Sequence, residues 1–361
     1  PWRCCHADTL DAMSARPRVA VVFGGRSPEH PISCLTAGTV MAVLDRDRYD
    51  VVAVGVTREG RWVVGSGPGE MAPVGADGLP EVTPQPSQQT TPPGQPPAVL
   101  GEADVVLPLL HGAYGEDGTV QGLLEVADVR YVGSGVLASA VAMDKSVMKT
   151  LLAAAGVPVC RWVTVTRDRW AADPDAVAAE VVQLGWPVFV KPARAGSSFG
   201  ITKVSAPDGL AAANEYASEY DPKLVIEEMV VGREVECGVL EGQDGRPPEV
   251  SVLGEVLVSG DHEFYDFEAK YTDGDALTLV IPADVPGDAT AQLQHLAPAA
   301  FTALCCEGLA RVDFFLTDEG RLVLNEVNTM PGFTPSSMFP RLWAASGIDY
   351  AALVDRLVTT A

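Results

Sequence analysis

Two carboxylates and a carboxamide lie close together near the C-terminal end of the chain, where they could hold a divalent metal. They are Asp313, Glu326 and Asn328, and Arg311 lies two residues before the first of them. Hard oxygen ligands of this kind suit Mg²⁺, which often bridges substrate phosphates. The apolar run 322–324 predicts a strand, on which residues two apart point the same way. An acidic strand end followed by a turn would contain the same residue types, so this segment alone leaves both interpretations open.

A loop rich in glycine and serine, residues 191–200, is the second candidate site. It contains Gly196, Ser197 and Ser198 and follows Lys191, which ends an apolar strand. The Walker A pattern is absent and no helix is predicted after the loop, so it reads as a strand–loop–strand hairpin. Glycine lets backbone N–H groups approach phosphates closely. An ordinary hairpin would also be rich in these residues, but Lys191 together with Lys145 favours phosphate binding.

Alternating strands and helices must position these groups. Apolar runs at 18–23, 49–56 and 104–110, with helical spacing at 32–44 and 121–126, predict an N-terminal domain with a parallel sheet. Ligands of such sheets gather at the carboxyl ends of strands, where Gly24-Gly25 and His111-Gly112 fall. The following regions are predicted to have a helix at 144–155, strands at 187–191, 200–204, 224–227, 235–240, 252–258, 277–281, 312–316 and 322–324, and a helix at 290–304.

Charge and composition restrict the class of protein. The formal net charge of −23 argues against nucleic acid or an anionic membrane as partner. Any bound phosphates must therefore be met by locally placed Lys, Arg and metal. The hydrophobic share of 47% is ample for packed cores. The 7 cysteines form no CxxC pattern, which favours reduced thiols in a cytoplasmic protein.

Two segments are expected to lie outside the folded domains. Residues 1–16 lack the apolar stretch of a signal peptide and are expected to be a disordered or non-native extension, with Met13 as a candidate start. Residues 65–97 are rich in Pro, Gly, Gln, Thr and Ser, which predicts a flexible surface insert that touches no motif.

The chain resembles the D-alanine–D-alanine ligases of the ATP-grasp superfamily, from about residue 18 to the C-terminus. The matching stretches are 24–33 (GGRSPEHPIS), 111–122 (HGAYGEDGTVQG), 133–135 (GSG), 143–145 (MDK), 190–200 (VKPARAGSSFG), 265–271 (YDFEAKY), 311–313 (RVD) and 325–334 (NEVNTMPGFT). The resemblance implies a three-domain α/β and α+β fold, with ATP between two mainly antiparallel sheets. The domains would be 17–133, 134–231 and 232–361.

The same resemblance implies the reaction and its partners. ATP would phosphorylate one D-alanine, and the amine of a second would attack the acyl phosphate through a tetrahedral intermediate. Two Mg²⁺ ions, for which Mn²⁺ can substitute, would accompany ATP. The product, D-alanyl-D-alanine, is a peptidoglycan precursor of bacterial cell-wall synthesis, so the enzyme would be cytoplasmic. The resemblance also suggests a homodimer, with no membrane or nucleic-acid partner.

Most site residues are assigned only by this resemblance. It implies that the metal ligands are Asp313, Glu326 and Asn328. The expected ATP-binding residues are Lys145, Lys191, Ser197, Ser198, Glu227, Met229, Val230, Glu234 and Lys270. The expected substrate-binding residues are Glu29, His111, Arg311 and Ser337, with Ser336 as an alternative to Ser337.

Arg311 and the backbone N–H of Gly332 would stabilise the oxyanion. Glu29 would hold the ammonium of the first D-alanine and form a hydrogen-bonded triad with Ser197 and Tyr271. Residues 263–275, including Lys270, are expected to form a lid that excludes water.

Three alternatives stand beside this interpretation. A D-alanine–D-lactate ligase would carry a histidine in the loop where Tyr271 stands. Another ATP-grasp carboxylate–amine ligase would share the loop and the metal ligands but lacks the 111–122 and 268–271 motifs. A catalytically silent nucleotide-binding module would be expected to have lost a metal ligand or Arg311, and none is missing.

Overall fold

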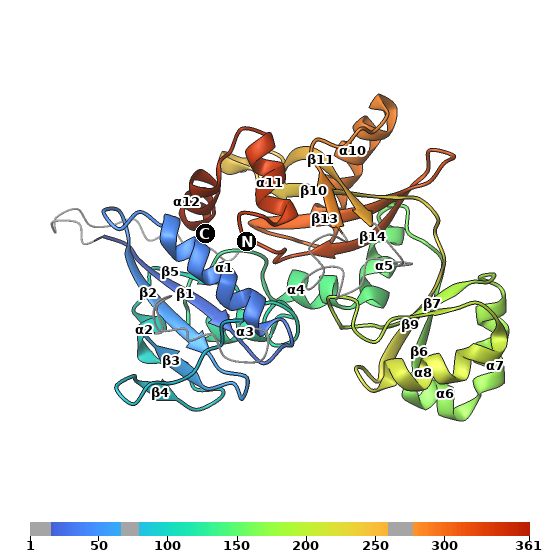
Figure 1. The fold of residues 1–361 in the computed structure, drawn as a ribbon, viewed down its shortest axis with the longest axis horizontal. Helices are drawn as coiled ribbons and strands as arrows, with labels where there is room; N and C mark the ends of the chain where they lie inside the picture. The colour runs from blue at the N-terminus through green and yellow to red at the C-terminus, as the bar shows by residue number, and fades with distance from the viewer. Residues whose placement is uncertain (1–15, 66–78, 259–276) are drawn as a thin grey trace.

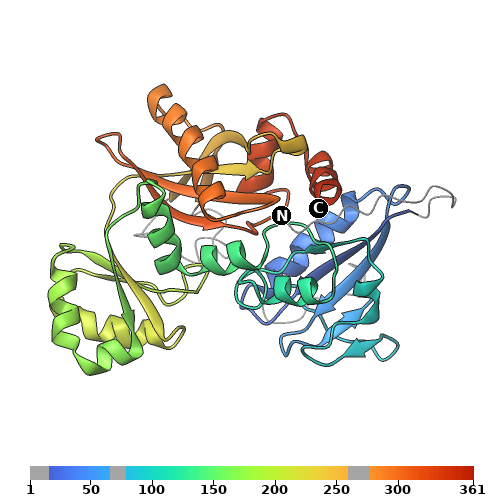
Figure 2. The same ribbon diagram turned by 180° about the vertical axis from the view of Figure 1, so that it is seen from behind.

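The computed structural model describes residues 16–65, 79–258 and 277–361. The described chain contains three β-sheets, each with its own helices (Figure 1). The blue N-terminal region and the green-to-yellow middle region lie at opposite ends in both views, and the orange-to-red C-terminal region adjoins both (Figure 2).

The N-terminal sheet has the order β4-β3-β2-β1-β5, and β1 pairs in parallel with both β2 and β5. β1 is a run of small apolar residues that is buried almost throughout, as expected for a central parallel strand. The predicted parallel strands are therefore confirmed, whereas β3 and β4 extend the sheet as antiparallel strands at one edge. Its elements are β1 (Arg18–Gly24), α1 (His30–Val43), β2 (Asp50–Val56), β3 (Trp62–Val64), β4 (Thr90–Thr91), α2 (Ala98–Gly101), β5 (Val105–Pro108) and α3 (Thr119–Val126).

The middle sheet is antiparallel, with the order β6-β9-β7-β8. Valines and isoleucine of its strands pack on α7 and α8 to form one core. Its elements are β6 (Trp162–Thr166), α6 (Arg167–Ala172), α7 (Pro174–Val182), β7 (Val188–Pro192), β8 (Thr202–Val204), η1 (Pro207–Gly209), α8 (Leu210–Ser218) and β9 (Lys223–Glu228).

The C-terminal sheet is also antiparallel, with the order β12-β11-β10-β13-β14. The expected pair of antiparallel sheets is thus present. The elements are β10 (Arg233–Leu240), η2 (Gln243–Gly245), β11 (Glu249–Val258), β12 (Leu277–Val280), α10 (Gly287–Ala303), β13 (Leu309–Leu316), β14 (Leu322–Asn328), α11 (Met338–Ala345) and α12 (Tyr350–Thr360).

Two helices connect the regions. α4 (Val136–Met143) and α5 (Lys145–Ala154) share their buried side chains, such as Met148 and Leu152, with the core of the C-terminal sheet. The core of the middle sheet includes no residue of either helix. The domain limits 17–133, 134–231 and 232–361 stay predictions, but α4 and α5 pack with the last of these parts.

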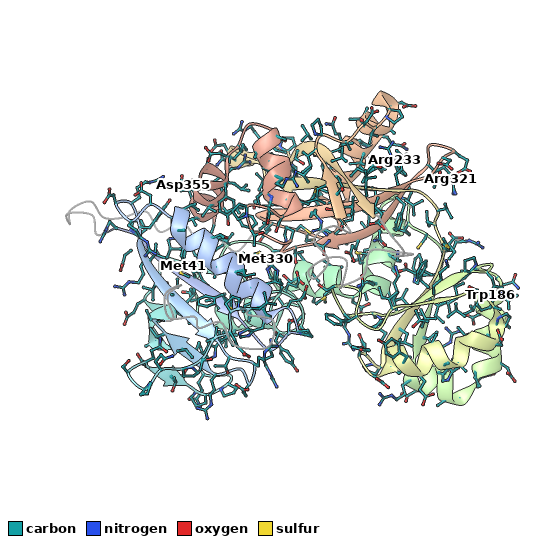
Figure 3. All side chains as sticks on the ribbon, viewed as in Figure 1. Met41, Trp186, Arg233, Arg321, Met330 and Asp355 are labelled. Atoms are coloured by element: carbon teal, nitrogen blue, oxygen red, sulfur yellow. The ribbon has the colours of Figure 1, made fainter. Side chains whose placement is uncertain are left out.

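The N-terminal sheet and the C-terminal helices form one continuous core. Met41 on α1 and Met330 after β14 are both buried in it, and Asp355 on α12 accepts a hydrogen bond from the Tyr49 hydroxyl at 2.7 Å (Figure 3). This shared core fixes the N-terminal part of the site against the segment that follows β14.

The prediction that the 65–97 insert touches no motif is wrong at Val82. This side chain is buried, and its N–H donates to Nε2 of His30 over 3.0 Å. In the same insert, β4 extends the N-terminal sheet. A proline- and glycine-rich composition therefore concealed a segment that places one buried valine at the start of α1 and adds an edge strand to the sheet.

Candidate active site

A cleft with about 980 Å³ of empty space lies between the middle and C-terminal sheets. Both sheets and the glycine-rich loop contribute side chains to it. They include Lys145, Lys191, Ser197, Ser198, Glu227, Val230, Glu234, Glu236, Arg311, Asp313 and Glu326. The cleft thus contains most of the residues that were predicted to bind ATP and metal.

The C-terminal wall of the cleft carries a row of acids across three paired strands. Asp313 on β13 is the register partner of Glu236 on β10 and of Glu326 on β14. Asn328 Nδ2 donates to Asp313 Oδ2 over 2.9 Å. Arg311 donates to both carboxylate oxygens of Asp313, each at 2.8 Å, and its Nε lies 3.0 Å from Glu236 Oε2. Arg311 therefore partly neutralises this acidic wall.

The predicted metal ligands come together at this wall. Within the described ranges, no group of three or more His, Cys, Asp or Glu side chains is arranged to hold a metal. The predicted set contains only two carboxylates, and its third member is an amide next to Asp313. This set of hard oxygen donors fits Mg²⁺, whose remaining ligands in phosphate-transfer sites are usually waters and phosphate oxygens. Asp313, Glu326 and Asn328 therefore fit such an ion.

The opposite wall carries lysines around one buried carboxylate. Glu227 on β9 accepts a hydrogen bond from Lys191 Nζ through Oε2 at 2.8 Å, and its Oε1 lies 3.3 Å from Lys149 Nζ. Burial alone would raise the pKa of Glu227, but Lys149 and Lys191 together lower it to about 2. Glu227 is thus an anion at neutral pH.

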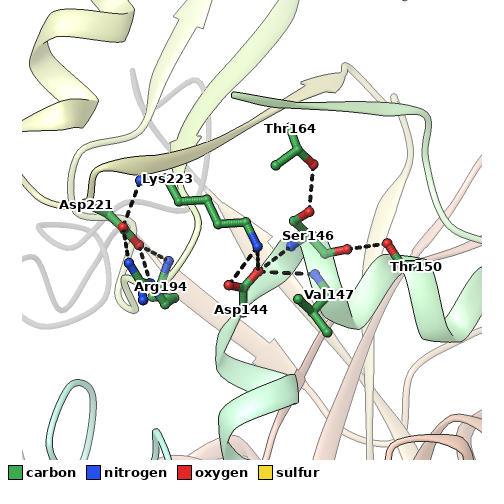
Figure 4. A network of polar contacts seen from close by, with 8 residues as sticks. All are labelled: Asp144, Ser146, Val147, Thr150, Thr164, Arg194, Asp221 and Lys223. Carbon is green, nitrogen blue, oxygen red and sulfur yellow. Dashed lines mark hydrogen bonds and ion pairs between the residues drawn. The ribbon is translucent and has the colours of Figure 1, made fainter. Parts of the chain in front are cut away.

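Helix α5 presents Lys145 to the cleft because its first turn is fixed. Asp144 caps the helix by accepting hydrogen bonds from the N–H groups of Ser146 and Val147, and Lys223 of β9 pairs with the same carboxylate at 2.8 Å (Figure 4). The Ser146 hydroxyl lies 2.6 Å from that of Thr164. These contacts hold the start of α5 against the middle sheet, although the rest of the helix packs on the C-terminal sheet.

The glycine-rich loop is held near its start and has unusual backbone conformations in the middle. Asp221 accepts two side-chain hydrogen bonds from Arg194 (Figure 4), and Lys145 Nζ donates to Ala195 O over 2.8 Å. Ser197 and Ser198 have φ of 48° and 60°, which is uncommon for residues other than glycine. Consecutive residues of this kind turn backbone N–H groups toward one point, as anion-binding loops require.

The N-terminal region reaches the cleft through Glu29. The hydroxyl of Ser197 donates to Glu29 Oε1, so the loop and the start of α1 are in contact. A Cβ on Gly112 would lie only 2.7 Å from Glu29 Oε2, which explains why glycine stands there. The N–H of Gly112 donates to Glu116 at 2.8 Å. Burial and the nearby Glu29 raise the pKa of Glu116 to about 8.

His111 lies beside this carboxylate pair. Its Nδ1 is 3.1 Å from Met330 O, and among the described residues its buried Nε2 has no hydrogen-bond partner. Burial lowers the pKa of His111 against the opposing effect of Glu29. A buried ring nitrogen without a protein partner is the arrangement expected of a group that faces a ligand.

Besides Arg311 on β13, the predicted oxyanion and carboxylate-binding residues Gly332 and Ser337 lie just beyond β14. Ser337 precedes α11, and its Oγ accepts the N–H of Thr334 at 3.1 Å and lies 2.8 Å from the Thr334 hydroxyl. A Cβ on Gly332 would lie 3.2 Å from this Oγ, so Gly332 and Ser337 are neighbours. The Ser336 hydroxyl also lies within hydrogen-bond distance of the Thr334 hydroxyl, at 3.0 Å.

The hinge after β9 is only partly in the cleft. Glu227 and Val230 line it, whereas the N–H of Met229 bonds to Pro187 O at 3.3 Å. Lys270, Tyr271 and the expected lid at 263–275 lie outside the described residues.

Sequence reasoning missed three residues that the structure brings to the site. Lys149 lies four positions after Lys145, and this spacing puts both on one face of a helix. Glu236 lies two positions after Glu234 on β10 and shares its face. Glu116 stood inside the quoted 111–122 motif without an assigned role.

The comparisons with known proteins agree with this geometry. The family model for the D-ala D-ala ligase N-terminus matches residues 18–134, and the model for the C-terminus matches residues 151–359. The chain belongs to the D-alanine–D-alanine ligase family. The resemblance noted in the sequence is therefore confirmed.

Individual relatives match nearly the whole chain. The D-alanine--D-alanine ligase of Arthrobacter sp. is 54% identical, over 95% of this chain and 94% of the relative. The VanG D-Ala:D-Ser ligase from Enterococcus faecalis is 34% identical, with TM-score 0.78 over 96% of this chain and 99% of that one. The D-alanine--D-alanine ligase from Bacillus anthracis, solved in complex with ATP, is 26% identical, with TM-score 0.73 over 95% and 97%.

No helix in the described part of the chain is both long and apolar enough to cross a bilayer.

Proposed function

We propose that this protein joins two molecules of D-alanine to D-alanyl-D-alanine at the expense of ATP. The observation that carries the proposal is the contact between Ser197 and Glu29. It joins a loop suited to phosphate binding to a carboxylate suited to an amino-acid ammonium, so both substrates of an acyl phosphorylation meet at one place. The D-alanine--D-alanine ligases to which the chain is similar supply the identity of the amino acid.

In the proposed first step, a carboxylate oxygen of one D-alanine attacks the γ-phosphorus of ATP, and ADP leaves with the electrons of the broken P–O bond. Lys145, Lys191 and the N–H groups of the glycine-rich loop hold the phosphates. Val230, Met229 and Glu227 lie at the adenine end, with Glu234 at the ribose. Glu29 and His111 orient the first D-alanine, which brings its carboxylate near the phosphate.

Asp313, Glu326 and Asn328 would hold Mg²⁺, with Mn²⁺ as a substitute. Such ions neutralise charge on a transferring phosphoryl group.

In the proposed second step, the neutral amine of another D-alanine attacks the carbonyl carbon of the acyl phosphate. The tetrahedral intermediate places negative charge on the former carbonyl oxygen, toward which Arg311 and the N–H of Gly332 donate. The intermediate then expels inorganic phosphate. Ser337 binds the carboxylate of the second D-alanine. Lys270 and Tyr271 act from the lid, Tyr271 as the third member of the triad with Glu29 and Ser197.

The proposal extends to the setting of the enzyme. The product serves cell-wall synthesis in a bacterium, so we place the protein in the cytoplasm and infer that it works as a homodimer. Size-exclusion chromatography with light scattering tests the assembly, since a mass near 38 kDa rather than twice that value would contradict it.

The test of the reaction is phosphate release from ATP and Mg²⁺ with D-alanine, D-serine or D-lactate, alone and in pairs, with the products identified by mass. The expected product from D-alanine alone is the dipeptide, and it should persist when D-lactate competes at neutral pH. A mixed ester or a D-alanyl-D-serine product would contradict the proposed acceptor. ATP turnover with neither kind of product would mean that the amine acceptor is a different compound.

A further inference from the structure

Lys149 is the most deeply buried charged side chain near the cleft, and the proposed reaction gives it no task. Its side chain has 0% exposure, and it lies on α5 four residues after Lys145. Its ammonium has two neighbours: Glu227 Oε1 at 3.3 Å and Cys160 Sγ, to which it donates, at 3.3 Å. Burial by itself would lower the pKa of Lys149, but Glu227 and Cys160 raise it above the usual value. Lys149 is therefore a fixed cation.

Lys149 and Lys191 share one carboxylate but differ in freedom. Glu227 is only 4% exposed and gives one oxygen to each lysine. Lys191 has 13% exposure and lines the cleft, whereas Lys149 has none. Only Lys191 can therefore turn toward a ligand in the cleft, since the ammonium of Lys149 is fully enclosed by protein. If it does so, the carboxylate that it leaves still has a partner.

The cost of this movement depends on Lys149. A buried ion that loses its partner is destabilised by several kcal/mol, on the order of 3–5 in typical cases. Without Lys149, Glu227 would keep Lys191 as its ion-pair partner, with Lys145 contributing only through its charge, and it would hold Lys191 more strongly. With Lys149 in place, Glu227 pairs with two ammonium groups. Lys191 can then leave Glu227 and bind another anion, because Glu227 stays paired with Lys149.

We infer that Lys149 is a positioning residue that keeps Glu227 paired and thereby releases Lys191 to the phosphates of the nucleotide. The inference rests on the proposed nucleotide site. It concerns the ion pairs of the site before the nucleotide binds. The two lysines that pair with Glu227 have different roles, because Lys149 remains paired with Glu227 and Lys191 turns toward the phosphates.

Ligand affinity in a Lys149→Met variant tests this. The variant keeps the length of the side chain and removes the charge. We expect the Kd for ADP to rise about tenfold or more, the equivalent of one lost charged contact. The Kd for adenosine, which has no phosphate, should stay within about twofold, because the variant keeps Glu227 and every other side chain assigned to the base and ribose. Lys149→Arg should bind both ligands like the parent, since it restores the cation.

A merely structural role would give a different result. If Lys149 only supports the fold, Lys149→Met lowers the midpoint of thermal unfolding and leaves the ratio of the two Kd values unchanged, which would overturn the inference. Both titrations are made at a temperature well below the unfolding midpoint of each variant.

A second pair of variants keeps the inference testable if Lys149→Met does not fold. Glu227→Gln removes the carboxylate for which the two lysines compete, and the double variant Glu227→Gln with Lys149→Met removes both charges of the pair. The inference predicts ADP affinities within about threefold of each other for these two proteins. A much weaker affinity of the double variant would show that Lys149 acts on the nucleotide by itself, against the inference.

Lys191→Met separates this inference from the proposed site. If Lys191→Met weakens ADP binding and Lys149→Met does not, the inference is wrong and the site stands. If Lys191→Met also leaves ADP binding intact, the assignment of the phosphate site is wrong.

Discussion

The two walls of the cleft are opposite in charge but are built on the same plan. The middle-sheet wall, or lysine wall, has the ammonium groups of Lys145, Lys149 and Lys191 near one carboxylate, Glu227. The C-terminal wall, or acidic wall, has the carboxylates of Glu236 and Asp313 paired with one guanidinium, that of Arg311. In each wall one residue of the opposite sign, Glu227 or Arg311, pairs with two of its neighbours.

The difference between the walls explains how a chain with a formal charge of −23 can handle ATP. The lysine wall supplies positive charge at short range, where a low dielectric makes it effective. The acidic wall needs a cation before it can accept phosphates, and its oxygen donors suit Mg²⁺. The distant negative surface is screened within about 8–10 Å at ordinary ionic strength. Local placement therefore outweighs net charge.

The largest effect that would test this contrast is expected from Asp313→Ala. Asp313 is central to the acidic wall, so its loss should lower ligation about a thousandfold or more and change the dependence of the rate on Mg²⁺. Phosphate release measured over a range of Mg²⁺ concentrations checks this. Asp318→Ala, an exposed carboxylate in the β13–β14 turn, is the matched control and should behave like the parent. An unchanged Mg²⁺ dependence in Asp313→Ala would remove the metal assignment.

The next largest effect is expected from Arg311. Arg311→Ala should lower kcat about a hundredfold to a thousandfold, because a fixed donor to the oxyanion is lost. Arg311→Lys keeps the charge but not the paired geometry with Asp313, and it should recover only part of the rate. Steady-state kinetics with D-alanine as the varied substrate makes the measurement. If Arg311→Ala ligates like the parent, the oxyanion role is wrong, although the ion pair with Asp313 stands.

The C-terminal wall could be predicted from the sequence more completely than the lysine wall. The spacing of Glu326 and Asn328 indicated that they share one face of a strand. Arg311 and Asp313 share a face of β13 in the structure, although the predicted strand began only at residue 312. The pairing of β13 with β14 and β10 is non-local, and no local pattern revealed that Glu236 faces Asp313. The direction of Arg311, toward the acids of its own wall, also depends on that pairing.

The lysine wall combines elements that are distant in sequence. Lys149 lies on α5, Lys191 on β7 and Glu227 on β9. Periodicity could show that Lys149 shares a helix face with Lys145, but not that the face meets a buried carboxylate. The prediction that the 65–97 insert touches no motif was wrong for a related reason. Composition describes the average of a segment, and the buried Val82 is a single residue in it. β6 and α6 to α8 had weaker local signals and were not predicted.

A smaller effect is expected where the lysine wall meets the N-terminal region. Ser197→Ala removes the hydrogen bond to Glu29 but keeps the backbone of the glycine-rich loop. We expect kcat/KM for D-alanine to fall about tenfold, because a charge-assisted hydrogen bond is lost, with little change in the KM for ATP. Ser205→Ala, an exposed serine after β8 with no assigned role, is the control. An equal loss for both substrates would mean that Ser197 acts on the nucleotide rather than through Glu29.

The smallest effect concerns His30, which lies outside both walls and holds the start of α1. Nδ1 lies 2.7 Å from Gly25 O, and Nε2 accepts the N–H of Val82 at 3.0 Å, so the neutral ring donates through Nδ1. Burial lowers the pKa of His30 against the opposing contact with Gly25. The folded state therefore resists protonation more than the unfolded chain does. Stability from His30 is present above the unfolded pKa of about 6.5 and is lost as the pH falls from there toward the lower folded pKa.

His30 should accordingly lower the thermal-unfolding midpoint of the parent as the pH is lowered from about 7.5 to about 5.5, whereas Glu116, with its pKa raised to about 8, acts in the opposite direction over the same range. His30→Asn keeps a donor for Gly25 and cannot titrate in this range, so its unfolding midpoint should fall less on acidification than that of the parent. Equal pH dependence in the two proteins would assign the acid sensitivity to another group. A smaller fall in the variant would show that one neutral histidine holds the insert at Val82 on the first helix, apart from the charges that serve the cleft.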